Sequence, residues 1–318
     1  PHTLSAMNNL AETLRAQGEL AGARTLQEQV LAIIRRVLGE EHPHTLSAMN
    51  NLAGTLGAQG NLAGARTLQE QTLAVRRRLL GEDHLDTLAS MNNLAGTLRA
   101  QGDLAGARAL QEQTLAVSRR VLGEEHLRTL GTMNNLANTL QEQGDLARAR
   151  ALQERVLTVR RRVLGEEHPD TLTSMNNLAG TLGAQGDLAG ARTLQEQTLA
   201  VRRRLLGEEH PDTLALMNNL AGTLRAQGDL AGARALQEQT LVVSRRVLGE
   251  EHPDTLGAMN SLAETLLSMG MLGEAQQLQK EALALQRNLL SRATDPLAGA
   301  TFKHSAFQSL SKGISERG

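Results

Sequence analysis

The stretch MNNLAGTLGAQGDLAGARTLQEQTLAV, residues 175–201, contains two segments of helical periodicity separated by Gly186. Apolar residues recur at intervals of three or four positions, which places them on one face of a helix. Glycine is a typical residue at the end of a helix, and Asp187 is placed to cap the helix that follows. The stretch therefore predicts two helices joined by a tight turn. The apolar positions of the first helix are Leu172, Met175, Leu178, Ala179 and Leu182.

The same pattern returns every 42 residues, and a block of three such repeats returns at 126 residues. One helix pair cannot bury its own apolar stripe, whereas stacked pairs can. We therefore expect an all-α protein, a right-handed α-solenoid of seven helix-turn-helix repeats with a concave face made by the first helices. A tail at 295–318 is expected to form a short helix that caps the array, or to occupy a groove. The expected repeats span residues 1–42, 43–84, 85–126, 127–168, 169–210, 211–252 and 253–294.

The composition excludes several classes of function. The 318 residues carry a formal net charge of −1, so no global charge attracts the chain to nucleic acid or to an anionic membrane. The chain contains two phenylalanines, no tryptophan and no tyrosine, whereas base stacking needs aromatic faces. It has no cysteine and no apolar run near the length of a membrane span. We expect no cofactor, no membrane insertion and a cytoplasmic location.

The period, the NNLA core and the LGEEHPDTL linker resemble the tetratricopeptide repeat of the kinesin light chain subtype. Ala179, Ala191 and Gly186 stand at landmark positions of that repeat. The resemblance implies a scaffold that captures peptides in its concave groove and performs no chemistry. The sequence departs from the family pattern where aromatic or small residues are replaced. These positions are Met175, Leu182, Gln195 and Thr198.

We therefore predict a non-enzymatic scaffold that binds an extended peptide or a partner helix. Two alternatives stay open. One is a structural subunit or spacer fixed in a large multiprotein assembly. The other is the recognition array of a larger protein with an upstream enzymatic or nucleotide-binding domain. Pro1 falls at the position that Pro43 takes in the next repeat, so we expect the segment to begin inside a longer array.

The linker GEEHPDTL, residues 165–172, places an imidazole beside carboxylates and recurs with small changes. A catalytic zinc site needs three convergent ligands, whereas each linker holds a single histidine at this position. We therefore predict no metal and no catalytic residue. Glycine ends one helix and Pro-Asp-Thr begins the next, and the histidine is expected to cap the incoming helix or to bond a neighbouring linker. Arginines such as Arg160–Arg162 and Arg202–Arg204 lie in the last turns, where the linker carboxylates offset their charge.

Asparagine pairs in the first helices are the candidate binding residues. Their amides donate and accept, so a ladder of them can pair with an extended peptide backbone. The resemblance implies the same role, because groove asparagines bind peptides in arrays of this subtype. Alternatively, one asparagine of each pair bonds across to a neighbouring helix. The full set of expected groove residues is Asn50, Asn51, Asn92, Asn93, Asn134, Asn135, Asn176, Asn177, Asn218, Asn219, Arg99, Arg225 and Gln141.

Two further columns vary among the repeats near this groove. Arg15, Arg99 and Arg225 share one column, and we expect them to favour acidic residues in a partner. A second column holds glycine in four of the seven repeats, although glycine inside a helix costs about 0.5–1 kcal/mol relative to alanine. Close approach of a ligand backbone, close approach of an adjacent helix, or drift on a tolerant surface would each explain it. These glycines are Gly54, Gly96, Gly180 and Gly222.

Overall fold

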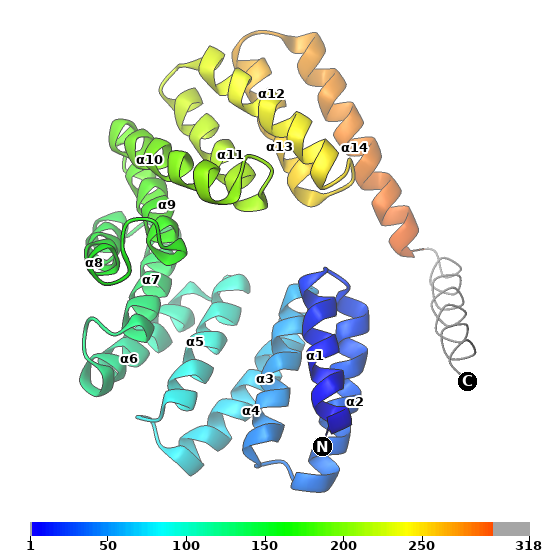
Figure 1. Cartoon of the computed structure of the whole chain (residues 1–318), viewed down its shortest axis with the longest axis vertical. Helices are drawn as coiled ribbons and strands as arrows, with labels where there is room; N and C mark the ends of the chain where they lie inside the picture. Colours follow the sequence, from blue (N-terminus) through cyan, green and yellow to red (C-terminus); the bar gives the residue numbers. More distant parts are fainter. Residues whose placement is uncertain (1, 295–318) are drawn as a thin grey trace. The chain divides into compact units, whose positions relative to one another are not determined.

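The computed structural model describes residues 2–294, and every regular element in that range is an α-helix (Figure 1). The helices follow one another in pairs, as expected for an α-solenoid of helix-turn-helix repeats. The expected tail, residues 295–318, lies outside the described residues. The helices are α1 (His2–Ala16), α2 (Leu20–Leu38), α3 (Pro43–Ala58), α4 (Leu62–Leu80), α5 (Leu85–Ala100), α6 (Leu104–Leu122), α7 (Leu127–Glu142), α8 (Leu146–Leu164), α9 (Pro169–Ala184), α10 (Leu188–Leu206), α11 (Pro211–Ala226), α12 (Leu230–Val247), α13 (Pro253–Ser268) and α14 (Leu272–Thr294).

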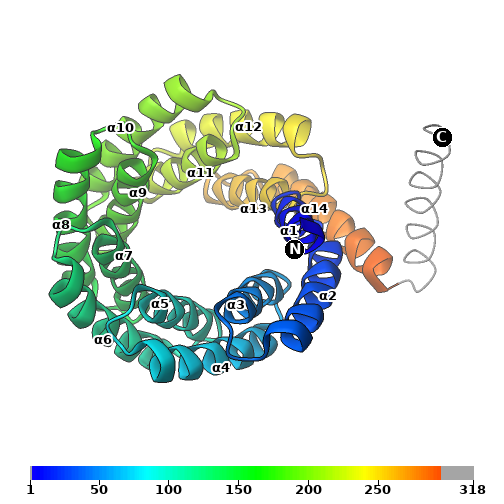
Figure 2. The same cartoon turned by 60° about the horizontal axis from the view of Figure 1, so that its bottom comes forward.

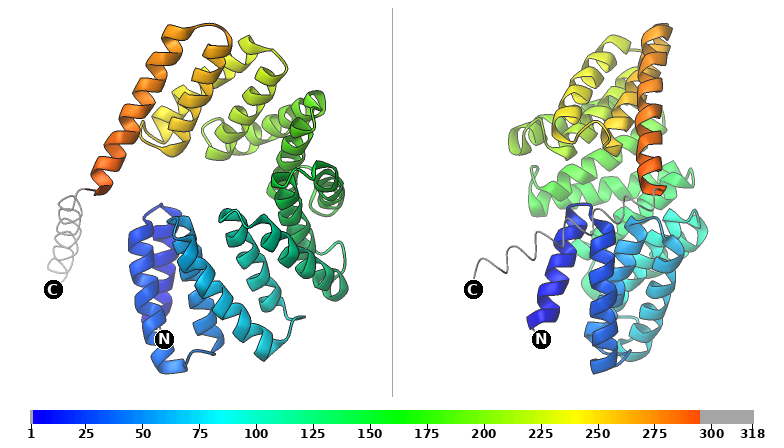
Figure 3. Two further views of the ribbon diagram at one scale, coloured as in Figure 1. Left: turned by 180° about the vertical axis from the view of Figure 1, so that it is seen from behind. Right: turned by 90° about the vertical axis from the view of Figure 1, so that its right-hand side faces the viewer.

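The chain forms two compact units, and the division between them falls inside α9. In the first unit, residues 1–181, α3, α5 and α7 lie on the inner side and α4, α6 and α8 on the outer side (Figure 2). In the second unit, α11 packs beside α12 and α13 beside α14, and α12 also contacts α13 (Figure 3). In the first unit, α1 to α8 pack in sequence, each helix against the next, and α10 to α14 do the same in the second unit.

The turns inside each pair follow from single residues. Gly186 has φ of +86°, a left-handed conformation that residues with a Cβ rarely adopt. Asp187 then accepts a hydrogen bond from the Gly190 backbone N–H at 2.9 Å and caps α10. Gly207 ends α10 with φ of +88°. The predicted stop at glycine and the predicted aspartate cap are both confirmed.

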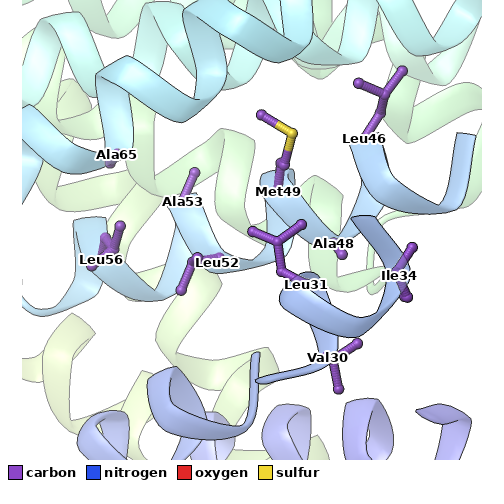
Figure 4. Close-up of a cluster of buried hydrophobic side chains, with 10 residues drawn as sticks. All are labelled: Val30, Leu31, Ile34, Leu46, Ala48, Met49, Leu52, Ala53, Leu56 and Ala65. Carbon is purple, nitrogen blue, oxygen red and sulfur yellow. The ribbon is translucent and has the colours of Figure 1, made fainter. Parts of the chain in front are cut away.

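The core lies at the junctions between successive pairs. Figure 4 shows one such cluster, in which Val30, Leu31 and Ile34 of α2 meet side chains of α3 such as Met49 and Leu52. Each is buried, and burial of a side chain of this size contributes about 1.5–3 kcal/mol. Neighbouring pairs thus stabilise one another. No helix among residues 2–294 combines the length and the apolar character needed to cross a membrane.

Candidate functional site

A groove of about 610 Å³ runs across the inner side of the first unit. Three successive first helices, α1, α3 and α5, contribute most of its lining. The surface is rich in side-chain amides and contains two of the recurring glycines. Its lining residues are Glu12, Arg15, Asn50, Asn51, Gly54, Gly57, Leu62, Gln69, Asn92, Asn93, Gly96, Thr97 and Ala100. The structure thus brings four of the predicted groove residues together, namely Asn50, Asn51, Asn92 and Asn93.

The asparagines also bond to one another between repeats. Asn93 donates from Nδ2 to Oδ1 of Asn50 at 3.0 Å, and Asn177 donates in the same way to Asn134 at 3.1 Å. The second asparagine of one repeat therefore contacts the first asparagine of the repeat before it. Each amide can make further hydrogen bonds, because it has two donors and an acceptor with two lone pairs. The contact between neighbouring repeats leaves capacity for a peptide.

Other predicted residues lie elsewhere or already have partners. Asn92 donates to the Thr132 hydroxyl at 3.0 Å, and Asn135 lies beside a separate cavity between α5, α6 and α7. Gln141 accepts a hydrogen bond from the Thr181 hydroxyl at 2.8 Å. Asn176 and Asn219 are both engaged in interactions within the chain, and the side-chain oxygen of Asn218 is buried. Several of the predicted groove residues are therefore engaged within the chain, and their role in binding a peptide stays a prediction.

The arginines expected to attract acidic partners hold ion pairs within the chain. Arg99 contacts Glu142 at 2.7 Å, and Arg225 contacts Glu264 at 2.7 Å, in each case in the next repeat. Arg15 pairs with Glu12 of its own helix at 3.0 Å. An acidic partner residue would have to compete with these carboxylates, so the structure offers little support for an acidic preference.

The glycine column is not explained by an adjacent helix. A Cβ built on Gly54, Gly96 or Gly222 would meet no atom within 4 Å, and on Gly180 it would meet only Nε2 of Gln141 at 3.8 Å. Gly54 and Gly96 line the groove. Open space above a glycine allows a ligand backbone to approach closely, so two of the three explanations stay open.

The linker histidines have a structural role that the sequence only suggested. His84, His126 and His168 each accept a hydrogen bond at Nδ1 from the backbone N–H two residues ahead, at 3.1 Å. The bond satisfies a donor in the first turn of the incoming helix, which confirms the predicted cap. His42, His210 and His252 make the same contact at 3.2 Å. Among the described residues, no group of three or more potential ligands is arranged to hold a metal ion.

The arginine clusters form regularly repeated ion pairs with the linker carboxylates. Arg161 contacts Glu166 of its own linker at 3.0 Å, and Arg246 contacts Glu209 of the preceding linker at 2.6 Å. Arg78 pairs with Glu41 and Arg120 with Asp83 in the same way. The partners are exposed, so each pair contributes about 0–1 kcal/mol. The expected compensation by linker carboxylates is confirmed for Arg161, Arg162 and Arg203. Arg160 bonds instead to the Asp170 carbonyl and the Ser174 hydroxyl.

The reasoning from sequence grouped the first arginine of each cluster, such as Arg160, with the arginines that follow it and missed its burial at the junction. Arg76 of α4 is only 7% exposed and donates to the backbone carbonyl of Asp86 at 3.1 Å and to the Ser90 hydroxyl at 2.8 Å. Burial lowers the pKa of Arg76, while the Asp86 carboxylate acts in the opposite direction. The equivalent residue in the next repeat is Ser118, beside a cavity of about 300 Å³. The available signal was that this repeat position holds arginine in some repeats and serine in others, namely Arg76, Ser118, Arg160, Arg202 and Ser244.

Comparison with known proteins identifies the repeat. The sequence profile of the tetratricopeptide repeat matches overlapping segments along the chain. The matched residues are 2–78, 46–120, 91–161, 128–204, 176–241 and 212–288. A comparison with curated protein sequences finds no relative.

Solved structures show the same kind of fold. Nearly identical TPR-like repeats of a Podosopora anserina kinesin light chain-like protein are 32% identical, with a TM-score of 0.55 over 64% of this chain and 97% of that chain. BtubC from P. vanneervenii is 23% identical, with a TM-score of 0.61 over 74% of this chain and 94% of its own. The apo form of RapI is 11% identical, with a TM-score of 0.66 over 91% and 99%. The last two share the fold alone.

Proposed function

Because the chain belongs to the tetratricopeptide repeat family, whose repeats generally mediate protein–protein interactions, we propose that it is a non-catalytic scaffold that binds an extended peptide or a partner helix. The binding site is the groove lined by α1, α3 and α5. The observation that supports it most directly is the convergence of four asparagine side chains from two repeats on one surface of about 610 Å³.

An extended peptide suits this surface better than a smooth apolar helix does. A peptide backbone alternates donors and acceptors, and asparagine amides offer both. Gly54 and Gly96 leave space beside the asparagines, so a backbone can approach the helices without meeting a methyl group. Gln69 of α4 also reaches the groove and adds a further, largely buried amide.

The proposal can be tested by selecting random linear peptides on the immobilised chain and measuring their affinity for variants. Asn51→Ala, Asn92→Ala and Asn93→Ala combined should weaken binding of the selected peptides at least tenfold, since each lost hydrogen bond contributes about 0.5–1.5 kcal/mol. A matched control removes three exposed amides outside the groove, Gln29→Ala, Gln71→Ala and Gln197→Ala. Equal affinity of both folded variants would remove the asparagines from the binding mechanism.

A further inference from the structure

The junction between α4 and α5 encloses an arginine side chain. The Arg76 guanidinium enters from α4 and donates to the Asp86 carbonyl and to the Ser90 hydroxyl. The junction between α8 and α9 repeats this arrangement with Arg160, which is 8% exposed and donates to the Asp170 carbonyl at 3.0 Å and to the Ser174 hydroxyl at 2.8 Å. Two junctions of the first unit therefore enclose a guanidinium with the same pair of acceptors.

The intervening junction, between α6 and α7, keeps the acceptors but lacks the arginine. Ser118 replaces the arginine, and the cavity of about 300 Å³ lies between α5, α6 and α7. Thr132 takes the place of Ser90 and donates to the Arg128 carbonyl at 3.1 Å, as Ser90 donates to the Asp86 carbonyl at 3.1 Å. Arg128 and Thr132, which carry the equivalents of that carbonyl and that hydroxyl, thus both line this cavity.

The remaining lining of this cavity, the Ser118 cavity, suits a donor-rich cation. The Asp86 residue lines it from α5, and the buried Asn92 Oδ1 has no hydrogen-bond partner in the described part of the chain. A guanidinium has five donors and no acceptor, so it complements carbonyl, hydroxyl and amide oxygens. Arg128 adds a like charge at the rim, but its side chain is exposed and donates toward the Leu85 carbonyl at 3.5 Å. Asp86 and Arg128 together leave the rim without net charge.

A second open junction lacks these features. The cavity between α1, α2 and α3, about 530 Å³, is lined by Ile34 and Ala48 at the positions equivalent to Ser118 and Thr132. Neither residue offers a hydroxyl, and most of the lining is aliphatic. Asn8, Ser47 and Asn51 also line this cavity, but a guanidinium would not find there the hydroxyl that binds Arg76 and Arg160 at the equivalent position. The chemistry for an arginine therefore belongs to the Ser118 cavity.

We propose that the Ser118 cavity binds the side chain of an arginine carried by a partner peptide. The inference rests on the proposed function, because the peptide would lie in the adjacent groove. Asn92 and Asn93 line both the groove and the cavity, so the two surfaces share part of their lining. Arg76 occupies the equivalent place in the repeat before, so the arginine column decides which junctions are open to a partner.

The test uses ethylguanidinium as a probe and follows the backbone amide resonances of Ser118 and Thr132 by NMR. Ethylammonium and acetate at the same millimolar concentration serve as comparison ligands. Ser118→Arg combined with Thr132→Ser places an internal arginine in the cavity, and Val121→Arg adds the same charge at an exposed position of α6. A second pair of measurements compares arginine-containing groove peptides with their Arg→Gln counterparts.

We expect saturable shifts with ethylguanidinium in the wild type and in Val121→Arg, and none in Ser118→Arg/Thr132→Ser. Arg→Gln in a bound peptide should lower its affinity about tenfold or more, because hydrogen bonds to a charged donor are lost. The milder Thr132→Val variant keeps the cavity and should also weaken the probe. Absence of probe shifts with intact binding of groove peptides overturns the arginine site and leaves the proposed function standing. Saturable binding of ethylguanidinium, with no peptide found to bind the groove, overturns the proposed function and leaves a guanidinium site. If acetate causes the same shifts, the cavity is not a cation site.

Discussion

The junction between α4 and α5 and the junction between α6 and α7 are built from similar repeat sequences, yet their interiors differ. Arg76 fills the first and is hydrogen-bonded to α5, whereas Ser118 leaves a cavity of about 300 Å³ in the second. The surrounding leucines, the histidine cap and the asparagines are retained. A repeat array can therefore keep its fold at every junction and change the chemistry of a single junction through a few side chains.

The comparison predicts its largest effect at Arg76. Arg76→Ala should lower the free energy of unfolding by about 2–3 kcal/mol, because it leaves a cavity and removes two hydrogen bonds from a charged donor. Ser118→Ala should cost much less. Repeat arrays can unfold one region at a time. The measurement is therefore thermal unfolding of the chain together with hydrogen exchange of the backbone amides in α4 and α5. The control is Arg78→Ala, which removes an exposed arginine that pairs with a linker carboxylate. An equal loss of unfolding free energy for both variants would contradict the prediction.

The reverse exchange should convert the second junction into the first. Ser118→Arg, Arg128→Asp and Thr132→Ser together recreate the residues found around Arg76. The filled cavity and the new hydrogen bonds should stabilise the chain by about 1–2 kcal/mol. Thermal unfolding measures the gain. Ser118→Arg alone keeps the rim charge of Arg128 and should gain less, so an equal gain would show that the rim charge is unimportant.

The histidine caps should be equivalent at the two junctions. His84→Ala and His126→Ala should each cost about 1 kcal/mol, the usual effect of removing an N-cap acceptor. His→Asn at the same positions keeps an acceptor and should recover most of the loss. Thermal unfolding of the four variants provides the measurement. A marked difference between the two alanine variants would indicate that the cap depends on how the junction is filled.

The smallest effect is expected in the glycine column. Gly96→Ala in α5 should stabilise the helix by about 0.5–1 kcal/mol, since the added methyl meets no neighbour. Asn138→Ala occupies the same column of α7 and should gain less, because asparagine is a better helix former than glycine. If a ligand backbone explains the column, Gly96→Ala will also weaken the selected peptides. Stabilisation without loss of peptide binding would favour the explanation that these positions vary freely on a tolerant surface.

Much of the fold was predictable because its determinants are local and repeated. Gly186 and Asp187 mark a turn in any sequence context, and the apolar period indicates helices without reference to their neighbours. The groove was predicted only in part. The sequence offered a bond from one asparagine of each pair to a neighbouring helix as an alternative, but it did not show that Asn93 bonds to Asn50. Their role in binding a peptide stays a prediction.

The amino-acid sequence by itself determined that this chain is an array of helix pairs, since spacing, capping residues and glycine ends act within a few residues. Only the tertiary structure decided which side chains meet across a junction. Arg76 reaches its acceptors ten and fourteen positions ahead, and Asn93 reaches Asn50 over 43 positions. Such contacts depend on how one repeat packs on the next, and helical periodicity within a repeat carries no information about that distance. The occupied and open junctions are therefore features of the packing.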